Sequence, residues 1–203
     1  MKLILFDFDG VLVNTNELSY QIHKIKNKDL TWQTFQGYLT GNFFEKMREA
    51  VKGGKHIPPD DYYGEYNKGL NNLTIEEALH NLILTLSVKY KIAIISSTIS
   101  SYIKGFIKKE KLSGCFADIW GADHHLSKTF KIKNIIEKYN LSPEDAIYIT
   151  DTTGDMIEAR ASGVECIGVS WGLHDKEDLL EEHPFAVVDT PEELKEKIEE
   201  FFK

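Results

Sequence analysis

Two aspartates follow a short apolar run at the start of the chain. Leu3 to Phe6 is apolar throughout, and Asp7 and Asp9 come next, before Gly10. An unbroken apolar run is typical of a strand buried on both faces of a parallel sheet, and ligands bind at the carboxyl ends of such strands. Two carboxylates ~4 Å apart repel by roughly 4 kcal/mol at an effective dielectric constant near 20. The pair therefore favours a bound cation or a shared proton, unless these aspartates only solvate a loop.

Further groups that bind metal or phosphate stand at the end of a predicted strand or the start of a predicted helix. The four places are Asp7 with Asp9, Ser96 with Ser97, Lys128, and Asp151 with Asp155. In a parallel sheet the carboxyl ends of the strands share one edge, so these groups are expected to converge. Aspartates that converge need a divalent cation, and oxygen ligands suit Mg²⁺. Because a lysine and a serine hydroxyl add positive charge and a donor for phosphate, the set predicts phosphoryl transfer.

The spacing suggests a role for each aspartate of the first pair. A carboxylate can attack phosphorus and form an aspartyl-phosphate, which splits one hard displacement into two easier ones. Asp7, nearest the strand, is the candidate nucleophile. Asp9 is placed to protonate the leaving oxygen and later to deprotonate the hydrolytic water. Gly10 leaves room for the chain to bend away.

The last aspartate pair is assigned to the metal. Asp151 is expected to hold the cation, and Asp155, one helical turn later, either binds it through water or fixes Lys128. Asp7 and Asp9 complete the expected metal ligands.

The elements that position these residues alternate between strand and helix from Thr74 to the end of the chain. Thr74 to Glu77 reads as a capping box that opens a helix. Apolar runs predict strands over 91–98, 116–120, 146–150, 164–169 and 185–188, with helices between them, one from Met156 to Ala161, and a terminal helix over 191–202. Strands separated by helices of this length need parallel crossovers. The expected fold is α/β, a Rossmann-like doubly wound parallel sheet.

Residues 14–73 interrupt this alternation just after the first strand. They contain no apolar strand run, whereas Leu18, Ile22 and Ile25 fall on one helical face. The prediction is a small α-helical cap of residues 14–73 on a core of residues 1–13 and 74–203.

Composition excludes several classes of partner. A net charge of -8 opposes a nucleic-acid surface. No segment approaches the ~20 apolar residues of a membrane span, so a cytoplasmic protein without membrane contact is expected. Cys115 and Cys166 are far apart and are expected to be reduced thiols. The oligomeric state is left open.

Four motifs together carry a resemblance to a known family. They are DFDGV at 7–11, the apolar strand ending in Ser96, Lys128 before a helix, and DTTGD at 151–155. In type and order they resemble the motifs of the haloacid dehalogenase superfamily, in the group with a small helical cap of the C1 type. The resemblance implies an aspartyl-phosphate intermediate and Mg²⁺ held by Asp7, the backbone carbonyl of Asp9, and Asp151. It also implies phosphate contacts from Ser96 and Lys128, to which Ser97 and Gly10 are added as neighbours.

Three positions depart from the family pattern. Thr150 stands where glycine is frequent, Asn14 stands where aspartate is frequent, and Lys128 is followed by Thr129 instead of proline. Lys131 is therefore a rival for the phosphate-binding lysine, and Lys128 is preferred because it precedes the predicted helix.

The second aspartate of the first motif decides between activities within the superfamily. Dehalogenases lack it, so Asp9 points to phosphatase or phosphomutase chemistry. The leading hypothesis is an Mg²⁺-dependent phosphatase acting on a small-molecule phosphate ester through an aspartyl-phosphate. A phosphomutase is the first alternative, and a phospho-acceptor signalling module that resembles a receiver domain is the remote one.

Overall fold

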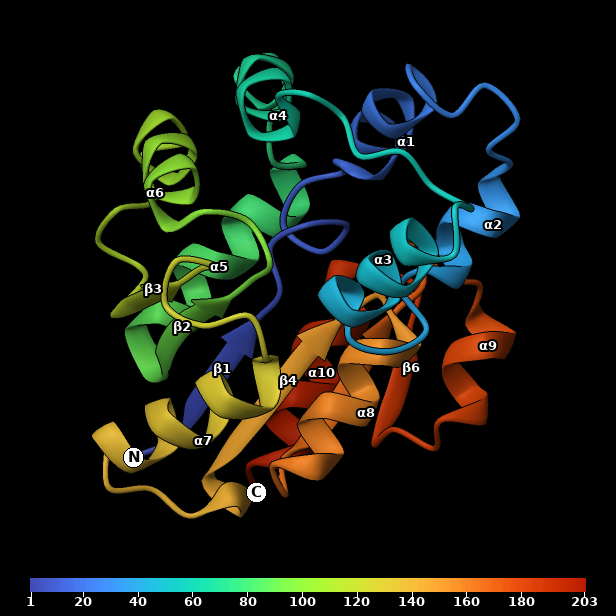
Figure 1. Cartoon of the computed structure of the whole chain (residues 1–203). Helices are drawn as coiled ribbons and strands as arrows, with labels where there is room; N and C mark the ends of the chain where they lie inside the picture. Colours follow the sequence, from blue (N-terminus) through green and yellow to red (C-terminus); the bar gives the residue numbers. More distant parts are fainter.

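The computed structural model describes residues 1–203 and has a six-stranded parallel sheet at its centre (Figure 1). The strand order is β3-β2-β1-β4-β5-β6, and every neighbouring pair is parallel. The strands are β1 (Leu3–Phe6), β2 (Lys91–Ile95), β3 (Asp118–Trp120), β4 (Ala146–Thr150), β5 (Glu165–Val169) and β6 (Ala186–Val188). This order confirms the doubly wound α/β fold.

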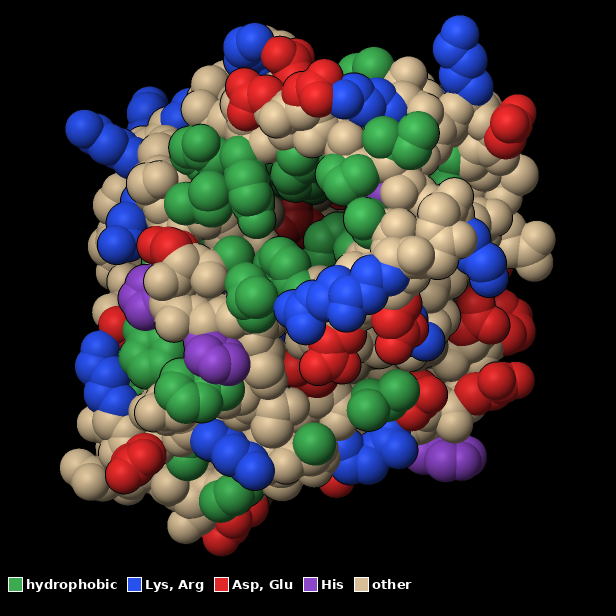
Figure 2. Space-filling model, viewed as in Figure 1, with side chains coloured by type: hydrophobic (Ala, Val, Ile, Leu, Met, Phe, Trp, Pro, Cys, Tyr) green, Lys and Arg blue, Asp and Glu red, His purple; other side chains and the backbone are tan.

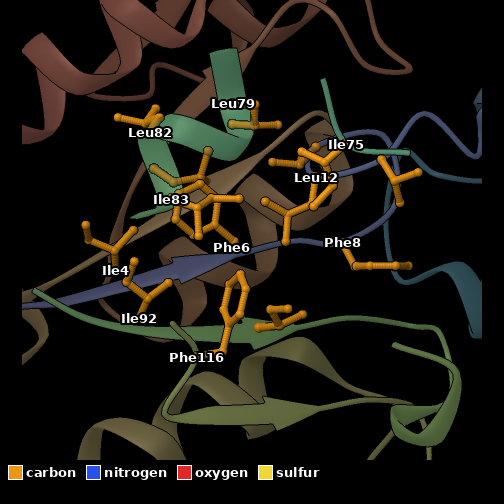
Figure 3. Packing of buried hydrophobic residues seen from close by; sticks show 14 of the residues in the cluster. Ile4, Phe6, Phe8, Leu12, Ile75, Leu79, Leu82, Ile83, Ile92 and Phe116 are labelled. Atoms are coloured by element: carbon orange, nitrogen blue, oxygen red, sulfur yellow. The ribbon is translucent and has the colours of Figure 1, made fainter. Parts of the chain in front are cut away.

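The first strand lies in the middle of the sheet because both of its faces are apolar. All four of its side chains are fully buried. Successive strand residues point to opposite faces, and accordingly Ile4 and Phe6 belong to one hydrophobic cluster while Leu3 and Leu5 belong to another. Figure 3 shows Phe6 beside Ile83 of a covering helix, and Ile4 beside Ile92 of the neighbouring strand β2.

Six helices cover the two faces of the sheet in layers. Apolar residues of α5 (Glu77–Lys89), α6 (Ser100–Lys109) and α10 (Pro191–Phe201) share the cluster of Ile4 and Phe6. Those of α7 (Lys128–Lys138), α8 (Thr153–Ala161) and α9 (Lys176–Glu181) share the other cluster, and a short 3₁₀ turn, η1 (Pro143–Asp145), precedes β4. No helix of the chain is long and apolar enough to cross a membrane.

Four further helices lie between β1 and α5, as expected for a helical insertion after the first strand. They are α1 (Asn16–Lys24), α2 (Trp32–Gly37), α3 (Phe43–Lys52) and α4 (Tyr62–Leu70). In Figure 1 they lie beyond the carboxyl ends of the strands. We call residues 14–73 the insertion.

The insertion is in direct contact with the sheet edge. Tyr66 and Leu70 of α4 belong to the same cluster as Ile4 and Phe6. The backbone of Gly154 at the start of α8 donates to the Leu39 carbonyl over 3.1 Å. The insertion therefore closes over the edge at which the predicted site residues end their strands.

The capping box predicted at Thr74 is wrong. Helix α5 begins at Glu77, and its N-cap Glu76 is extended and makes no side-chain capping bond. Instead, the Ile75 N–H donates to the Glu110 carboxylate over 3.2 Å, and the Ile75 side chain packs in the core. These tertiary contacts keep the segment extended up to Glu76.

Several other element boundaries also differ from the sequence prediction. The strand predicted over 91–98 ends at Ile95, and the strands predicted from 116, 164 and 185 begin at 118, 165 and 186. Helix α8 begins at Thr153, ahead of the predicted Met156, because the Thr152 hydroxyl accepts from the Asp155 N–H and caps it. The start of α8 is thus set by a capping contact that apolar periodicity does not report.

The turn after β1 depends on Gly10. Its φ is +74°, and a Cβ there would lie 1.9 Å from Oδ2 of the buried Asp151 carboxylate. Gly105 in helix α6 offers a matched control, because a Cβ there meets nothing within 4 Å.

We expect Gly10→Ala to lower the free energy of unfolding by at least about 1–2 kcal/mol, the cost of a left-handed backbone for a residue with a Cβ. Gly105→Ala is expected to raise it by about 0.5–1 kcal/mol, because alanine is favoured in a helix interior. Urea unfolding followed by circular dichroism measures both. Equal effects of the two substitutions would contradict the steric role of Gly10.

Candidate active site

Asp7 continues the line of β1 at the carboxyl edge of the sheet. Its N–H donates to the Ile149 carbonyl of β4 over 2.9 Å, so the residue still belongs to the ladder of the sheet. Its Oδ1 accepts from the Phe8 N–H at 2.7 Å. Phe8 is fully buried and anchors the chain before the turn at Gly10.

Lys128 lies between two carboxylates from different elements. Its Nζ is 2.9 Å from Asp7 Oδ2 and 2.5 Å from Asp155 Oδ2, and all three side chains are buried. Burial disfavours the lysine charge, yet Asp155 and Asp7 raise the pKa of Lys128 above its usual value. Two carboxylates thus share one ammonium group at the sheet edge.

Asp7 and Asp155 do not share the Lys128 ammonium group equally. Burial raises the pKa of Asp7 well above its usual value, against the Lys128 ammonium and with Asp155 adding to the rise. Burial by itself also raises the pKa of Asp155, but the charge of Lys128 and the hydrogen bonds with Asp7, Lys128 and Thr150 together hold the pKa of that carboxyl below its usual range. Asp155 is consequently the stronger partner of Lys128, whereas the negative charge of Asp7 is less fully compensated.

Asp155 is further held by two hydroxyls of β4. Tyr148 Oη and Thr150 Oγ1 donate to its Oδ2 over 3.2 Å and 3.0 Å. Thr150 Oγ1 also accepts from the Thr152 N–H over 3.2 Å. Sequence reasoning missed both hydroxyl residues, although strand alternation places positions 148 and 150 on the same face. Thr150, which departs from the family pattern, thereby fixes the carboxylate that pairs with Lys128.

Hydroxyl groups surround Asp9. Thr15 Oγ1 donates to its Oδ1 over 2.7 Å, and Tyr66 Oη donates to the same oxygen. Thr98 Oγ1 and Ser96 Oγ donate to its Oδ2 over 2.9 Å and 3.2 Å. Tyr66 comes from the insertion and was not predicted, because nothing in its local sequence separates it from a packing tyrosine.

Only some of the predicted phosphate-binding residues line the cavity between the sheet edge and the insertion. Ser97 lines that cavity, whereas Ser96 and Gly10 do not. Ser96 is fully buried, and its Oγ accepts from the Thr98 N–H at 2.8 Å besides donating to Asp9.

Lys131, the rival lysine, points elsewhere. Its Nζ donates to the backbone carbonyls of Ser96 and Gly121 over 2.5 Å and 3.4 Å. Burial, reinforced by the charge of Lys128, lowers the pKa of Lys131 to about 8. Of the two lysines, the structure places Lys128 beside Asp7 and uses Lys131 to tie two loops together.

The carboxylate of Asp151 suits a cation. Its Oδ2 accepts from the Leu173 N–H at 2.8 Å and from Asn16 Nδ2 at 3.4 Å, while its Oδ1 is buried without any partner. Burial raises the pKa of Asp151 to about 7, with the Leu173 N–H opposing the rise. A buried carboxylate oxygen without a donor is costly, and a bound cation removes that cost. The residues present therefore fit the divalent cation that the motifs imply.

These side chains line one cavity of about 240 Å³ between the sheet edge and the insertion. Asp7, Asp9, Lys128, Asp151 and Asp155 all contribute to its lining. Figure 2 shows the hollow, with acidic atoms at its floor and hydrophobic side chains around its mouth. The geometry thus brings the candidate nucleophile Asp7, the neighbouring Asp9, Lys128 and the unpartnered oxygen of Asp151 to one cavity.

Known proteins share this arrangement of sequence and fold. The family model for haloacid dehalogenase-like hydrolases matches residues 4–169. A phosphoglycolate phosphatase of Synechococcus elongatus is 24% identical over 211 residues, covering 100% of both chains. The pyrophosphatase PpaX of Anoxybacillus flavithermus is 22% identical over 204 residues, covering 96% of this chain and 95% of the relative.

A solved structure extends the similarity to the whole fold. A haloacid dehalogenase-like family hydrolase from Streptococcus pneumoniae superimposes with a TM-score of 0.79 at 22% identity, covering 98% of each chain. The resemblance inferred from the four motifs is confirmed. The chain is an enzyme of the haloacid dehalogenase-like hydrolase family, and its curated relatives here are phosphatases.

Proposed function

We propose that the chain is an Mg²⁺-dependent phosphatase that hydrolyses a small phosphomonoester through an aspartyl-phosphate on Asp7. The contact of Asp7 Oδ2 with Lys128 Nζ at 2.9 Å, at the floor of the cavity, carries the proposal. A carboxylate beside a lysine can attack a phosphoryl group whose oxygens the lysine holds.

The reaction proceeds in two steps on the residues of this chain. Asp7 attacks phosphorus, the bond to the ester oxygen breaks, and Asp9 gives that oxygen a proton. Water then attacks the phosphoryl group on Asp7, Asp9 takes the proton of the water, and phosphate leaves with Asp7 restored. The four hydroxyl donors around Asp9 fix its carboxyl group in place.

The cation site and the lysine site have separate ligands in this proposal. Asp7, the backbone carbonyl of Asp9, and Asp151 hold Mg²⁺, which supplies charge neutralisation for the transferring phosphoryl group. Asp155 positions Lys128, in line with their contact. Ser97 and Lys128 contact phosphate, and Ser96 acts by orienting Asp9.

The insertion serves as the cap in this proposal. Residues 14–73 supply more than half of the residues that line the cavity and close over it, so product release requires this segment to move. The names of the relatives make phosphoglycolate and pyrophosphate obvious substrates for an assay.

Two alternatives predict different fates of the phosphoryl group. A phosphomutase returns it to the product alcohol, so that no solvent oxygen enters released phosphate. A phospho-acceptor signalling module keeps it on the aspartate without turnover. Hydrolysis in ¹⁸O-labelled water distinguishes all three, because only the phosphatase releases labelled phosphate catalytically.

Asp7→Asn is expected to abolish Mg²⁺-dependent phosphate release from phenyl phosphate, because an amide cannot form the acyl-phosphate. A colorimetric phosphate assay measures it. Asp29→Asn, at an exposed position outside the cavity, is the matched control and is expected to keep full activity. Retained activity of Asp7→Asn would rule out Asp7 as the nucleophile.

Substitutions of Lys128 and Lys131 are expected to have different effects. Lys128→Met should lower kcat/KM by about 10²–10³, the usual effect of losing one donor to a developing oxyanion. Lys131→Met should mainly lower the free energy of unfolding, because it leaves the Ser96 and Gly121 carbonyls without their donor. Steady-state kinetics and urea unfolding on both variants test the assignment, and reversed results would move the phosphate contact to Lys131.

Mg²⁺ is expected to raise the melting temperature of the protein through Asp151, since ligand binding to the folded state stabilises it. Asp151→Asn should lose this dependence on Mg²⁺, and Asp29→Asn should keep it. Thermal unfolding with Mg²⁺ and with EDTA provides the measurement without reference to activity. An unchanged Mg²⁺ response in Asp151→Asn would contradict the assigned ligand.

A further inference from the structure

The part of the cavity supplied by the insertion is mainly apolar. Figure 2 shows hydrophobic side chains around the mouth of the hollow. The volume of about 240 Å³ lies below the ~300–1,000 Å³ of pockets for drug-sized ligands, so the leaving group must be compact. The apolar members are Phe35, Leu39, Phe43, Met47, Pro58 and Pro59.

The charged residues of the cavity leave no cation for a leaving group. The carboxylates are Asp7, Asp9, Asp151, Asp155 and Glu158. The only lysine in the lining is Lys128, which Asp7 and Asp155 already engage, and there is no arginine. An anion on the leaving group would add like charge to this set without meeting a free lysine or arginine.

His23 is one of several residues with polar atoms that the insertion adds to the cavity, beside Thr15, Asn16, Ser19, Tyr62 and Tyr63. It lines the cavity, and its side chain is 4% exposed. Its Nδ1 lies 3.0 Å from Nε2 of His56, and its Nε2 has no hydrogen-bond partner. Burial, reinforced by the neighbouring His56, lowers the pKa of His23 to about 4, so the ring is neutral at pH 7.

The unpartnered nitrogen of His23 is buried beside the cavity, so a ligand group reaches it only when the insertion shifts. Depending on which histidine donates in the pair, Nε2 is either a donor or an acceptor. A hydroxyl or a primary amide can satisfy both cases, because each contains a donor and an acceptor. A carboxylate can only accept, and it would meet a neutral ring.

Lys46 lies beside a residue of the cavity lining. Its Cε lies 3.3 Å from where a Cβ on Gly41 would be, and Gly41 lines the cavity. Figure 2 shows a basic side chain beside the rim. Lys46 itself is exposed and does not line the cavity, and exposed ion pairs contribute little because water and salt screen them.

We propose that the site selects a phosphomonoester whose leaving group is compact and uncharged, with an apolar face toward the insertion and a hydroxyl or amide that pairs with His23. It discriminates against a leaving group that carries a carboxylate or a second phosphate. This inference rests on the proposed phosphatase function. It separates the chain from relatives named for phosphoglycolate and pyrophosphate, whose leaving groups are anionic.

A matched pair of substrates isolates the charge. 2-Phosphoglycolate and its amide have the same number of non-hydrogen atoms and differ by one negative charge. With Mg²⁺ at pH 7.5, we expect kcat/KM for the amide to exceed that for the carboxylate by at least tenfold, and pyrophosphate to be the poorest substrate. Equal values, or a preference for the carboxylate, would overturn the inference and leave the phosphatase proposal intact.

Two neighbouring positions on α3 test where the selectivity arises. Met47→Lys places a cation in the lining and is expected to shift the ratio toward the carboxylate by at least fivefold. Lys46→Met, one residue earlier, is expected to leave the ratio unchanged within twofold. A selective loss of phosphoglycolate turnover in Lys46→Met would show that the rim lysine recognises an anion, which contradicts the proposal.

The hydrogen bond to His23 is tested with a third substrate. Isobutyl phosphate matches the amide in size but has no polar group on its leaving group. His23→Phe, which keeps a flat ring, is expected to lower kcat/KM for the amide at least fivefold and to change that for isobutyl phosphate by less than twofold. Equal losses for both substrates would indicate a purely structural role and overturn the assignment of His23.

The same panel separates failure of the inference from failure of the proposed function. If the unaltered enzyme with Mg²⁺ hydrolyses none of these monoesters and no phenyl phosphate, then the phosphatase proposal fails, and the inference fails with it. Turnover of phenyl phosphate without any charge preference overturns only the inference.

Discussion

The structure depends on one buried ammonium group shared by two carboxylates. Lys128 from the start of α7 meets Asp7 at the end of β1 and Asp155 in the first turn of α8. The ammonium group lowers the electrostatic cost of holding two buried carboxylates close together. The contact therefore fixes how the ends of three elements are placed around the same small volume, and it leaves one carboxylate, that of Asp7, only partly compensated. The unpartnered Asp151 oxygen adds to that negative charge, which explains why the site suits a cation.

Neutral donors hold the remaining carboxylate oxygens. Asp9 receives hydroxyls from Thr15, Tyr66, Ser96 and Thr98. Hydroxyls fix the orientation of a carboxylate without neutralising it, in contrast to lysine or arginine. The orientation of Asp9 is thus fixed while its negative charge remains. This arrangement favours a metal ion, which can then hold a phosphate ester. Tyr66 has a second consequence, since it links the insertion to the residue proposed to move protons.

The insertion contributes both to the core and to the cavity. Tyr66 and Leu70 pack in the main hydrophobic cluster, while Phe43 and Met47 of α3 line the cavity. At Gly154 the backbones of insertion and core approach so closely that a Cβ would lie 2.4 Å from the Gly41 carbonyl oxygen. The glycine of the last motif therefore permits the two parts to touch.

The fold class and the family follow from the amino-acid sequence alone. Uniformly apolar strands predicted a buried parallel sheet. Polar groups at the strand ends and at one helix start then predicted that these groups converge at one edge of the sheet, and their order identified the family. Local sequence patterns do not show which side chains of separate elements come into contact, and these contacts are seen only in the tertiary structure. Lys128 and Lys131 lie three residues apart on one helix, and only the packing of α7 against β2 and α8 brings one to Asp7 and the other to backbone carbonyls. The same holds for the hydrogen bonds of Thr150, Tyr66 and the His23–His56 pair, which join residues that separate sequence patterns do not connect. The physical reason is that strand and helix periodicity fixes the side of an element on which a residue lies, whereas the partner it meets there depends on how separate elements pack.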